Sequence, residues 1–348
     1  MGQPTPLHSS QPKPLRILIF GHPRTACHLL FKMLTGKPET DGLVFLDAYT
    51  SGADRQNSYP PGNVIATPRR PVNGVVSYQT CLDEVQRVIA EDEKNGQLPI
   101  LLEHTHMLMT SATLNDHIFA PRTTRPSPVV ADKMLDVPSE SFEDGGWVFP
   151  GMFNNPQMQA AKIPNPTLLP DRFFFGFTPV ITIRHPALMI PSLIRGRQKL
   201  QGEPKLDCEF TPIATYRWEK MIFDCYRSCS LELGLKTVPV VIDGSKLVRD
   251  PKGTMRRLCD IIGVEEHEVV RYTWEPACQP ARDAFWETFT GDLRRSSGIK
   301  PVPVPETIDL TKEKTKWIKE WGPELAEEIE SWVNYSLKDY EYLFQYSI

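Results

Sequence analysis

The chain has 348 residues, 40% of them hydrophobic and 24% charged, which is enough to bury a sizeable core. The formal net charge of −4 argues against a general nucleic-acid binder, because such proteins carry a basic excess to meet phosphates. Seven scattered cysteines without a CxxC pair argue against a structural zinc site and favour a reducing compartment, so a cytoplasmic location is expected.

Residues 1–14 are rich in Pro and Ser, and we expect them to form a disordered tail. This stretch lacks the apolar core of a secretory signal, and Pro6 stands where N-myristoylation needs Ser or Thr. The sequence holds no apolar run near the length of about 18 residues that spans a membrane. Residues 15–348 are predicted to form a single domain.

Apolar runs and helical spacings alternate along that domain. Short apolar runs predict strands at residues 15–20, 98–102, 178–183 and 238–242. Helical periodicity predicts helices at residues 27–34, 75–90, 186–194, 212–233 and 250–262, and one or two helices at 317–344. Strands separated by helices indicate an α/β fold with a mostly parallel central sheet flanked by helices.

Three stretches are predicted to be loops. Residues 48–74 are polar and rich in Pro and Gly, and residues 300–310 form a Pro-rich connector. Residues 120–170 are dense in Pro, Ser and Asn, and a loop of this length in a compact protein is usually a lid or a binding loop. The stretch is interpreted either as a lid over an apolar acceptor or as a poorly ordered insertion.

Histidines gather in three segments that follow predicted strands. The segments are residues 21–28 (GHPRTACH), 103–106 (EHTH) and 184–186 (RHP). Ligands of such sheets bind outside the carboxyl ends of the strands, where all three segments begin. A three-histidine metal site of His104 and His106 with His22 or His28 is the rival interpretation. No carboxylate or cysteine pattern supports it, so no bound metal is expected.

The first of these segments has the elements of a phosphate site but lacks the Walker pattern. It opens a helix, whose free N–H groups and dipole attract an anion. Arg24 supplies a planar, permanently charged fork, Thr25 a hydroxyl group, and the small Ala26 lets the backbone approach a ligand. The alternative is a solvated turn that carries an incidental arginine.

Residues 23–30 (PRTACHLL) resemble the 5′-phosphosulfate loop of sulfotransferases, in which Pro, Lys or Arg, Ser, Gly, Ser or Thr, and Thr precede apolar residues. Arg184 ends a predicted strand and Ser192 follows eight residues later, the spacing of the family's 3′-phosphate ligands. Residues 241–263 resemble the family's late strand–helix unit. The resemblance covers roughly residues 15–300.

The resemblance implies a P-loop-like fold and 3′-phosphoadenosine 5′-phosphosulfate as the donor. It implies a catalytic role for Arg24 at the bridging oxygen. The donor-binding residues that it implies are Pro23, Arg24, Thr25, Ala26, Cys27, His28, Arg184, Ser192 and Gly298. Three of them, Ala26, Cys27 and His28, depart from the family's Gly and hydroxyl residues.

His104 and His106 are the candidates for a general base, because family members carry a catalytic His after the matching strand and imidazole titrates near neutral pH. The predicted function is sulfuryl transfer to a hydroxyl of a small, apolar or phenolic metabolite, in secondary metabolism. One alternative is the same fold recruited to a cyclisation or isomerisation that uses the histidines. The other is a non-catalytic nucleotide-binding scaffold.

Overall fold

A computed structural model describes residues 15–36, 45, 77–110, 112–114, 130–131, 163–204, 206, 210–233, 238–300, 305 and 307–348. The predicted tail at 1–14, the loop at 48–74, most of the stretch at 120–170 and part of the connector at 300–310 lie outside these residues.

Four parallel strands form the central sheet, in the order β2-β1-β3-β4. The strands are β1 (Ile17–Gly21), β2 (Ile100–His104), β3 (Thr178–Ile183) and β4 (Val240–Asp243). Each begins within two residues of a predicted strand, because a strand buried on both faces is a nearly continuous apolar run. The prediction of a mostly parallel α/β sheet is confirmed.

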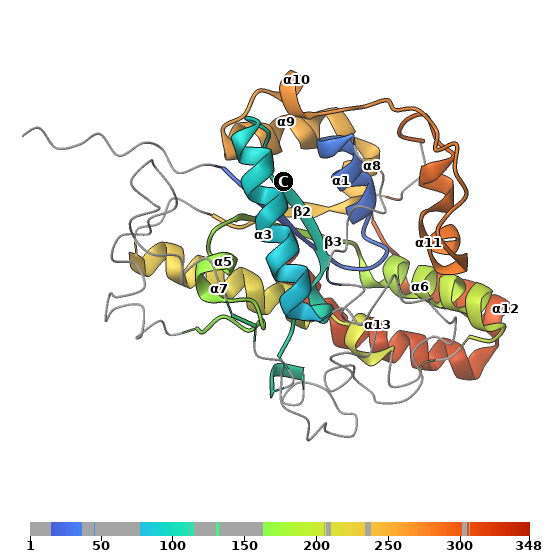
Figure 1. Cartoon of the computed structure of the whole chain (residues 1–348). Helices are drawn as coiled ribbons and strands as arrows, with labels where there is room; N and C mark the ends of the chain where they lie inside the picture. Colours follow the sequence, from blue (N-terminus) through green and yellow to red (C-terminus); the bar gives the residue numbers. More distant parts are fainter. Residues whose placement is uncertain are drawn as a thin grey trace, which may run out of the picture.

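Helices cover both faces of the sheet (Figure 1). The longer ones are α1 (Cys27–Thr35), α3 (Tyr78–Lys94), α6 (Pro186–Gln201), α7 (Arg217–Leu233), α9 (Pro251–Ile262), α11 (Ala284–Arg294), α12 (Leu310–Trp321) and α13 (Pro323–Phe344). The short ones are η2 (Thr105–Met107), α5 (Asp171–Phe174), η5 (Thr211–Ile213), α8 (Gly244–Arg249) and α10 (Glu266–Val269). None of the described helices combines the length and the apolar character that crossing a bilayer requires.

Several helices differ from their predicted bounds. The α6 helix runs to Gln201, beyond the predicted end at 194. The prediction stopped too early because the last turns of the helix are polar and carry no apolar periodicity. The predicted helix at 212–233 is split into η5 and α7. The terminal region, predicted as one or two helices at 317–344, forms α12 and α13, and α12 already begins at Leu310. Helix α11 was not predicted. Its aromatic and β-branched residues have low helix propensity, so its local sequence signal is weak.

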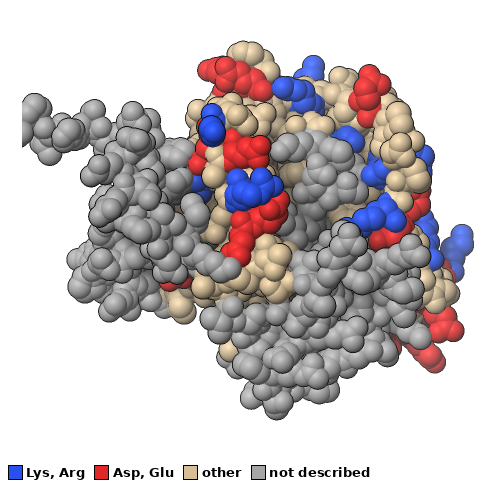
Figure 2. Space-filling model, viewed as in Figure 1, with Lys and Arg blue, Asp and Glu red and all other residues tan. Residues whose placement is uncertain are grey.

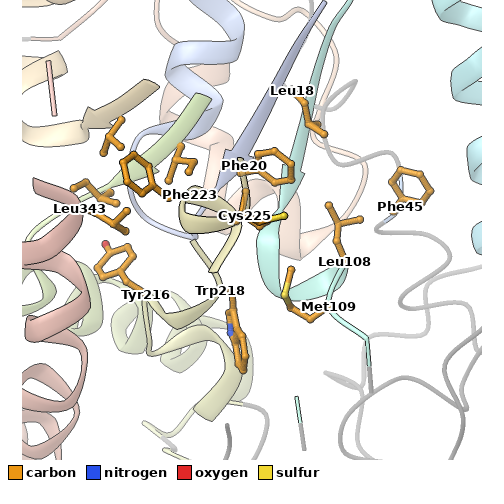
Figure 3. Close-up of a cluster of buried hydrophobic side chains, with 14 of the residues drawn as sticks. Leu18, Phe20, Phe45, Leu108, Met109, Tyr216, Trp218, Phe223, Cys225 and Leu343 are labelled. Carbon is orange, nitrogen blue, oxygen red and sulfur yellow. The ribbon is translucent and has the colours of Figure 1, made fainter. Parts of the chain in front are cut away.

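Successive side chains of β1 face two separate cores. Leu18 and Phe20 belong to the larger core, which α3, α6, α7 and α13 share and which Figure 3 shows in part. Ile17 and Ile19 belong to the smaller core, built with α1 and α9. Period-two alternation in a strand that is covered on both sides gives this result. The molecule therefore has a helix–sheet–helix layering.

Acidic and basic side chains are interspersed over the described part of the surface that Figure 2 shows. On α3, Arg87 pairs with Glu84 and Glu91 one helical turn away on either side. Such exposed pairs contribute little to stability. The face therefore carries mixed charge rather than a patch of one sign.

Candidate active site

All four strands end at one edge of the sheet, and the predicted segments meet there. The carboxyl end of β1 lies beside that of β2, since Gly21 is in register with His104. On the other side β3 leads into Arg184, and β4 ends at Asp243, in register with Ile183. Parallel pairing thus gathers segments that are far apart in the sequence.

The loop between β1 and α1 has an unusual backbone. Arg24 and Ala26 adopt left-handed conformations, with φ of 68° and 67°. Each such L-residue costs about 1–2 kcal/mol, and Ala26 occupies the position where the sulfotransferase pattern has Gly. Helix α1 begins at Cys27 without a side-chain cap, and, as in any helix, its first N–H groups have no carbonyl acceptor in a preceding turn. These groups suit an anion.

Two threonines fix the loop to the sheet. The Thr25 hydroxyl donates to the His22 carbonyl at 2.6 Å and lies 2.7 Å from the hydroxyl of Thr182 on β3. The His22 amide donates to Thr182 Oγ1 at 3.3 Å. The Thr25 hydroxyl, predicted as a phosphate ligand, thus has an internal role. Thr182 was missed because one hydroxyl within an apolar strand carries little signal.

The start of α8 passes directly beneath this loop. A Cβ atom added at Gly244 would lie 2.2 Å from the Thr25 carbonyl oxygen. No side chain other than hydrogen fits there without moving the loop. Asp243 caps α8 by accepting from the amides of Ser245 and Lys246. The end of β4 therefore supports the loop.

Arg24, Arg184 and Ser192 come together above β3. Arg24 Nε donates to Ser192 Oγ at 3.0 Å, and Arg184 Nη1 donates to the Arg24 carbonyl at 3.3 Å. Burial lowers the pKa of both guanidinium groups, and the positive charge of Arg184 lowers that of Arg24 further. Among the described residues neither arginine forms a salt bridge with a carboxylate.

Tyr216 holds Arg184 in place. Its hydroxyl donates to the Arg184 carbonyl at 2.6 Å and accepts from the Arg184 amide at 2.9 Å. The ring is fully buried, as is typical of an aromatic residue in the core. Its role beside Arg184 was missed, because sequence spacing does not show which backbone a buried hydroxyl reaches.

Helix α11 closes the site on the side of α6 (Figure 1). The Arg24 guanidinium lies 5.5 Å from the centre of the Phe289 ring, and Nη1 donates to the Phe289 carbonyl at 3.4 Å. The two helices pack closely at Gly196, where an added Cβ would lie 2.4 Å from the Phe289 ring. Arg24 is thus oriented by an element that the sequence did not predict.

His104 and His106 lie side by side at the end of β2. Their ring centres are 5.8 Å apart, although the chain turns into η2 between them rather than staying extended. His104 Nε2 lies 3.8 Å from Cys27 Sγ, and its ring centre lies 5.8 Å from that of His28. Burial lowers the pKa of His104 well below its usual value and that of His106 to about 3. Burial thus favours the neutral form of both imidazoles and makes each a weaker base than a solvated histidine.

Two other predicted histidines have structural partners. His22 is buried with Nδ1 2.9 Å from the Pro23 carbonyl oxygen, and burial lowers its pKa to about 4. His185 caps α6, with Nδ1 accepting from the Ala187 amide at 3.2 Å. The group of potential metal ligands in the described residues is Cys27, His28 and His104, which differs from the three-histidine alternative considered above.

Two buried carboxyl groups lie near the histidines. Glu103 is buried and accepts from the Phe45 amide at 2.8 Å. Glu219 on α7 is buried against η2, and burial raises its pKa to about 8 despite a hydrogen bond with Thr105. Glu219 was missed, because a charged residue within a helix is usually on its solvated face.

Gly298, the last of the predicted donor-binding residues, pairs with Thr273 in a short antiparallel bridge. This segment runs along the later turns of α1, where the Arg271 amide donates to the Met33 carbonyl at 2.6 Å. Its assignment to the donor site stays a prediction.

Two curated sulfotransferases are similar to this chain over nearly its whole length. Sulfotransferase ppzF of Metarhizium majus is 26% identical over 362 aligned residues, which cover 95% of this chain and 96% of the relative. Sulfotransferase ppzF of Metarhizium rileyi is 26% identical over 357 residues, with 95% of each chain covered. The chain is a divergent relative of these sulfotransferases.

The relationship supports an enzyme of the transferase class, as the sequence predicted. The parallel sheet with helices on both faces is consistent with a sulfotransferase fold. No family model and no solved structure matches the chain.

Proposed function

We propose that this sulfotransferase relative moves a sulfuryl group from 3′-phosphoadenosine 5′-phosphosulfate to a hydroxyl of a small metabolite. The observation that carries the proposal is the meeting of Arg24 and Arg184 at the first loop. They are half-buried and linked through the Arg24 carbonyl, and no described carboxylate pairs with them. Partly buried positive charges without a counter-ion are costly, so the pair favours an anionic ligand.

The donor carries two phosphate-type groups, and the site offers two matching regions. The first-turn amides of α1 suit the 5′-phosphosulfate, while Arg184 and Ser192 suit the 3′-phosphate. Arg24 connects the two regions, since its backbone lies in the loop and its side chain contacts Ser192. Its permanent charge would stabilise the negative charge that develops on the bridging oxygen.

The transfer needs one proton acceptor. The acceptor hydroxyl loses its proton to the neutral imidazole of His104 while its oxygen bonds to sulfur. The bond from sulfur to the bridging oxygen breaks, and 3′-phosphoadenosine 5′-phosphate leaves. A positioned base contributes roughly 10²–10⁴-fold to such a step. Contact with Cys27 at the start of α1 favours His104, and His106 is the alternative base.

Calorimetry with 3′-phosphoadenosine 5′-phosphate tests the donor site. The native chain should bind it, and Arg184→Ala should weaken binding by about 10- to 100-fold, because a charge-assisted hydrogen bond contributes about 1.5–3 kcal/mol. Arg195→Ala is the matched control. Arg195 is exposed on α6, where it pairs with Glu320 and lies over the Trp321 ring at the surface, so its removal should leave binding unchanged.

Two results would overturn the donor assignment: no binding by the native chain, or equal binding by the Arg184→Ala variant. Binding without transfer to any hydroxyl in a panel of phenols and alcohols would instead favour the scaffold alternative.

A recruited acid/base enzyme is the second candidate. The observation that favours it is the pair of neutral, buried imidazoles beside a loop strained at Ala26. If Arg24→Ala left the enzyme's reaction intact while His104→Ala or His106→Ala abolished it, this candidate would replace sulfuryl transfer. Loss of transfer in the Arg24→Ala variant supports the first.

A further inference from the structure

We propose that Cys27, His28 and His104 form a binding site for a divalent transition metal such as Zn²⁺. One ligand atom from each residue lies within 4.8 Å of the other two, and Cys27 Sγ is 3.8 Å from His104 Nε2. One thiol and two imidazoles are a typical donor set for zinc. This site requires neither the sulfate donor nor an acceptor.

The spacing of the donor atoms is close to what a zinc ion needs. With Zn–S near 2.3 Å and Zn–N near 2.0–2.1 Å, tetrahedral ligand atoms lie about 3.3–3.6 Å apart. The Cys27–His104 pair is already near this value at 3.8 Å, and the His28 ligand atom lies within 4.8 Å of both, so a change of side-chain rotamer angles would bring it into the site. Three protein ligands leave the fourth position for water.

The ligands come from two rigid elements that pack together. Cys27 and His28 are consecutive in the first turn of α1, and His104 is the last residue of β2. Gly21 leaves room for the thiol, since a Cβ added there would lie 2.9 Å from Cys27 Cβ and 3.1 Å from Sγ. The neighbouring Trp286 ring lies 5.8 Å from the His28 ring and shields that side. Two of the three ligands, Cys27 and His104, are therefore buried, and His28 is half-buried.

The site also accounts for the composition of the loop. Cys27 and His28 stand where the sulfotransferase pattern has hydroxyl residues. These two replacements are the residues that meet His104 in the fold. Hydroxyl side chains at both positions would leave one imidazole, which is too few ligands for a stable zinc site.

Metal binding changes the number of bound protons but not the oxidation state of any group. The ion displaces the Cys27 thiol proton, so one proton is released for each metal bound and no electron is transferred. His104 Nε2 cannot hold a metal and accept a proton from a hydroxyl at the same time. Metal loading and sulfuryl transfer should therefore compete, a consequence that rests on His104 being the base of the proposed function.

Titration of the metal-free, full-length protein with Co²⁺ tests the site. We expect one ion per chain, the visible bands of tetrahedral cobalt and a near-ultraviolet thiolate-to-cobalt band. Cys27→Ser should remove the thiolate band, and His28→Gln should weaken Co²⁺ and Zn²⁺ binding at least 10-fold, the loss that even outer-shell changes produce. Cys278→Ser, which removes an exposed thiol outside the site, should change neither.

A cobalt spectrum without a thiolate band would overturn the metal site, as would a spectrum unaffected by Cys27→Ser and His28→Gln. Far-ultraviolet circular dichroism of each variant separates loss of ligands from loss of fold. The titration contains no donor, so its outcome is independent of the calorimetry with 3′-phosphoadenosine 5′-phosphate. Either the metal site or the donor site can therefore fail alone.

Discussion

Ala26 carries a conformational cost that glycine would not. Its φ of 67° lies in the left-handed region, and it also serves as the uncapped N-cap of α1. An L-residue pays about 1–2 kcal/mol there, of which the extra backbone entropy of glycine in the unfolded chain offsets about 0.4–1 kcal/mol. Two contacts of the neighbouring Thr25 hold the loop in this conformation: its hydroxyl lies against Thr182, and its carbonyl packs against Gly244.

We expect Ala26→Gly to raise the free energy of unfolding by up to about 1 kcal/mol. Urea unfolding measures the change. The control is Ala90→Gly in the exposed interior of α3, which should lower the free energy of unfolding by about 1 kcal/mol, because its backbone is already helical. Equal destabilisation by both substitutions would mean that position 26 is not strained.

Tyr216 is the residue through which the core positions Arg184. Tyr216→Phe removes both hydrogen bonds of the hydroxyl, so Arg184 should become less well fixed and the affinity for 3′-phosphoadenosine 5′-phosphate should fall about 3- to 30-fold. Calorimetry measures the affinity.

Tyr226→Phe is the control that distinguishes a loss of protein stability from a loss of Arg184 positioning. The Tyr226 hydroxyl donates to the Phe174 carbonyl in the larger core. This variant should lose stability by about 1–3 kcal/mol, as Tyr216→Phe should, but keep the native affinity. A loss of affinity in both variants would show that general destabilisation, rather than positioning of Arg184, is the cause.

At the scale of elements, the packing of α7 against η2 places a carboxyl group in an apolar interior. Burial raises the pKa of Glu219 to about 8, so the folded chain keeps this proton at neutral pH whereas the unfolded chain, with an ordinary value of 4.5, releases it. The folded state then binds more protons between these two values. The free energy of unfolding should therefore fall as pH rises from about 4.5 to about 8.

Glu219→Gln keeps the shape of the side chain and removes the titration. We expect this variant and the native chain to have similar stability at pH 5, and the variant to be a few kcal/mol more stable at pH 9, at about 1.4 kcal/mol for each pKa unit. Thermal or urea unfolding across this pH range measures the difference. Glu328→Gln, on the exposed face of α13, should show no such trend; a matching trend there would contradict the assignment to Glu219.

At the scale of the whole molecule, the sheet was accessible from the sequence because strands buried on both faces are apolar throughout. Helices that end at a glycine C-cap, such as α1 at Gly36 and α9 at Gly263, were predicted because the glycine marks the helix end in the sequence. Arg24, Arg184 and Ser192 were found through a spacing that resembles a family pattern. The structure brings these three together.

The supporting residues were not accessible in this way. Glu219 looks like a surface residue, Tyr216 like a core aromatic, and Thr182 like a minor break in a strand. Their roles arise from tertiary packing: α7 buries Glu219 against η2, and β3 aims the Thr182 hydroxyl at the loop. Helix α11 has no strong local signal, so its contact with Arg24 could not be anticipated.

The contact between Arg24 and the Phe289 carbonyl spans 265 positions of the chain. During synthesis the first loop emerges early, whereas the helix that orients its arginine emerges near the end. Until then Arg24 has no partner on α11, and contacts of such long range are intrinsically slow to form. The chain should therefore acquire its sheet well before the contacts around Arg24 are complete, and the newly made protein should become able to bind the proposed donor only in the last stage of folding.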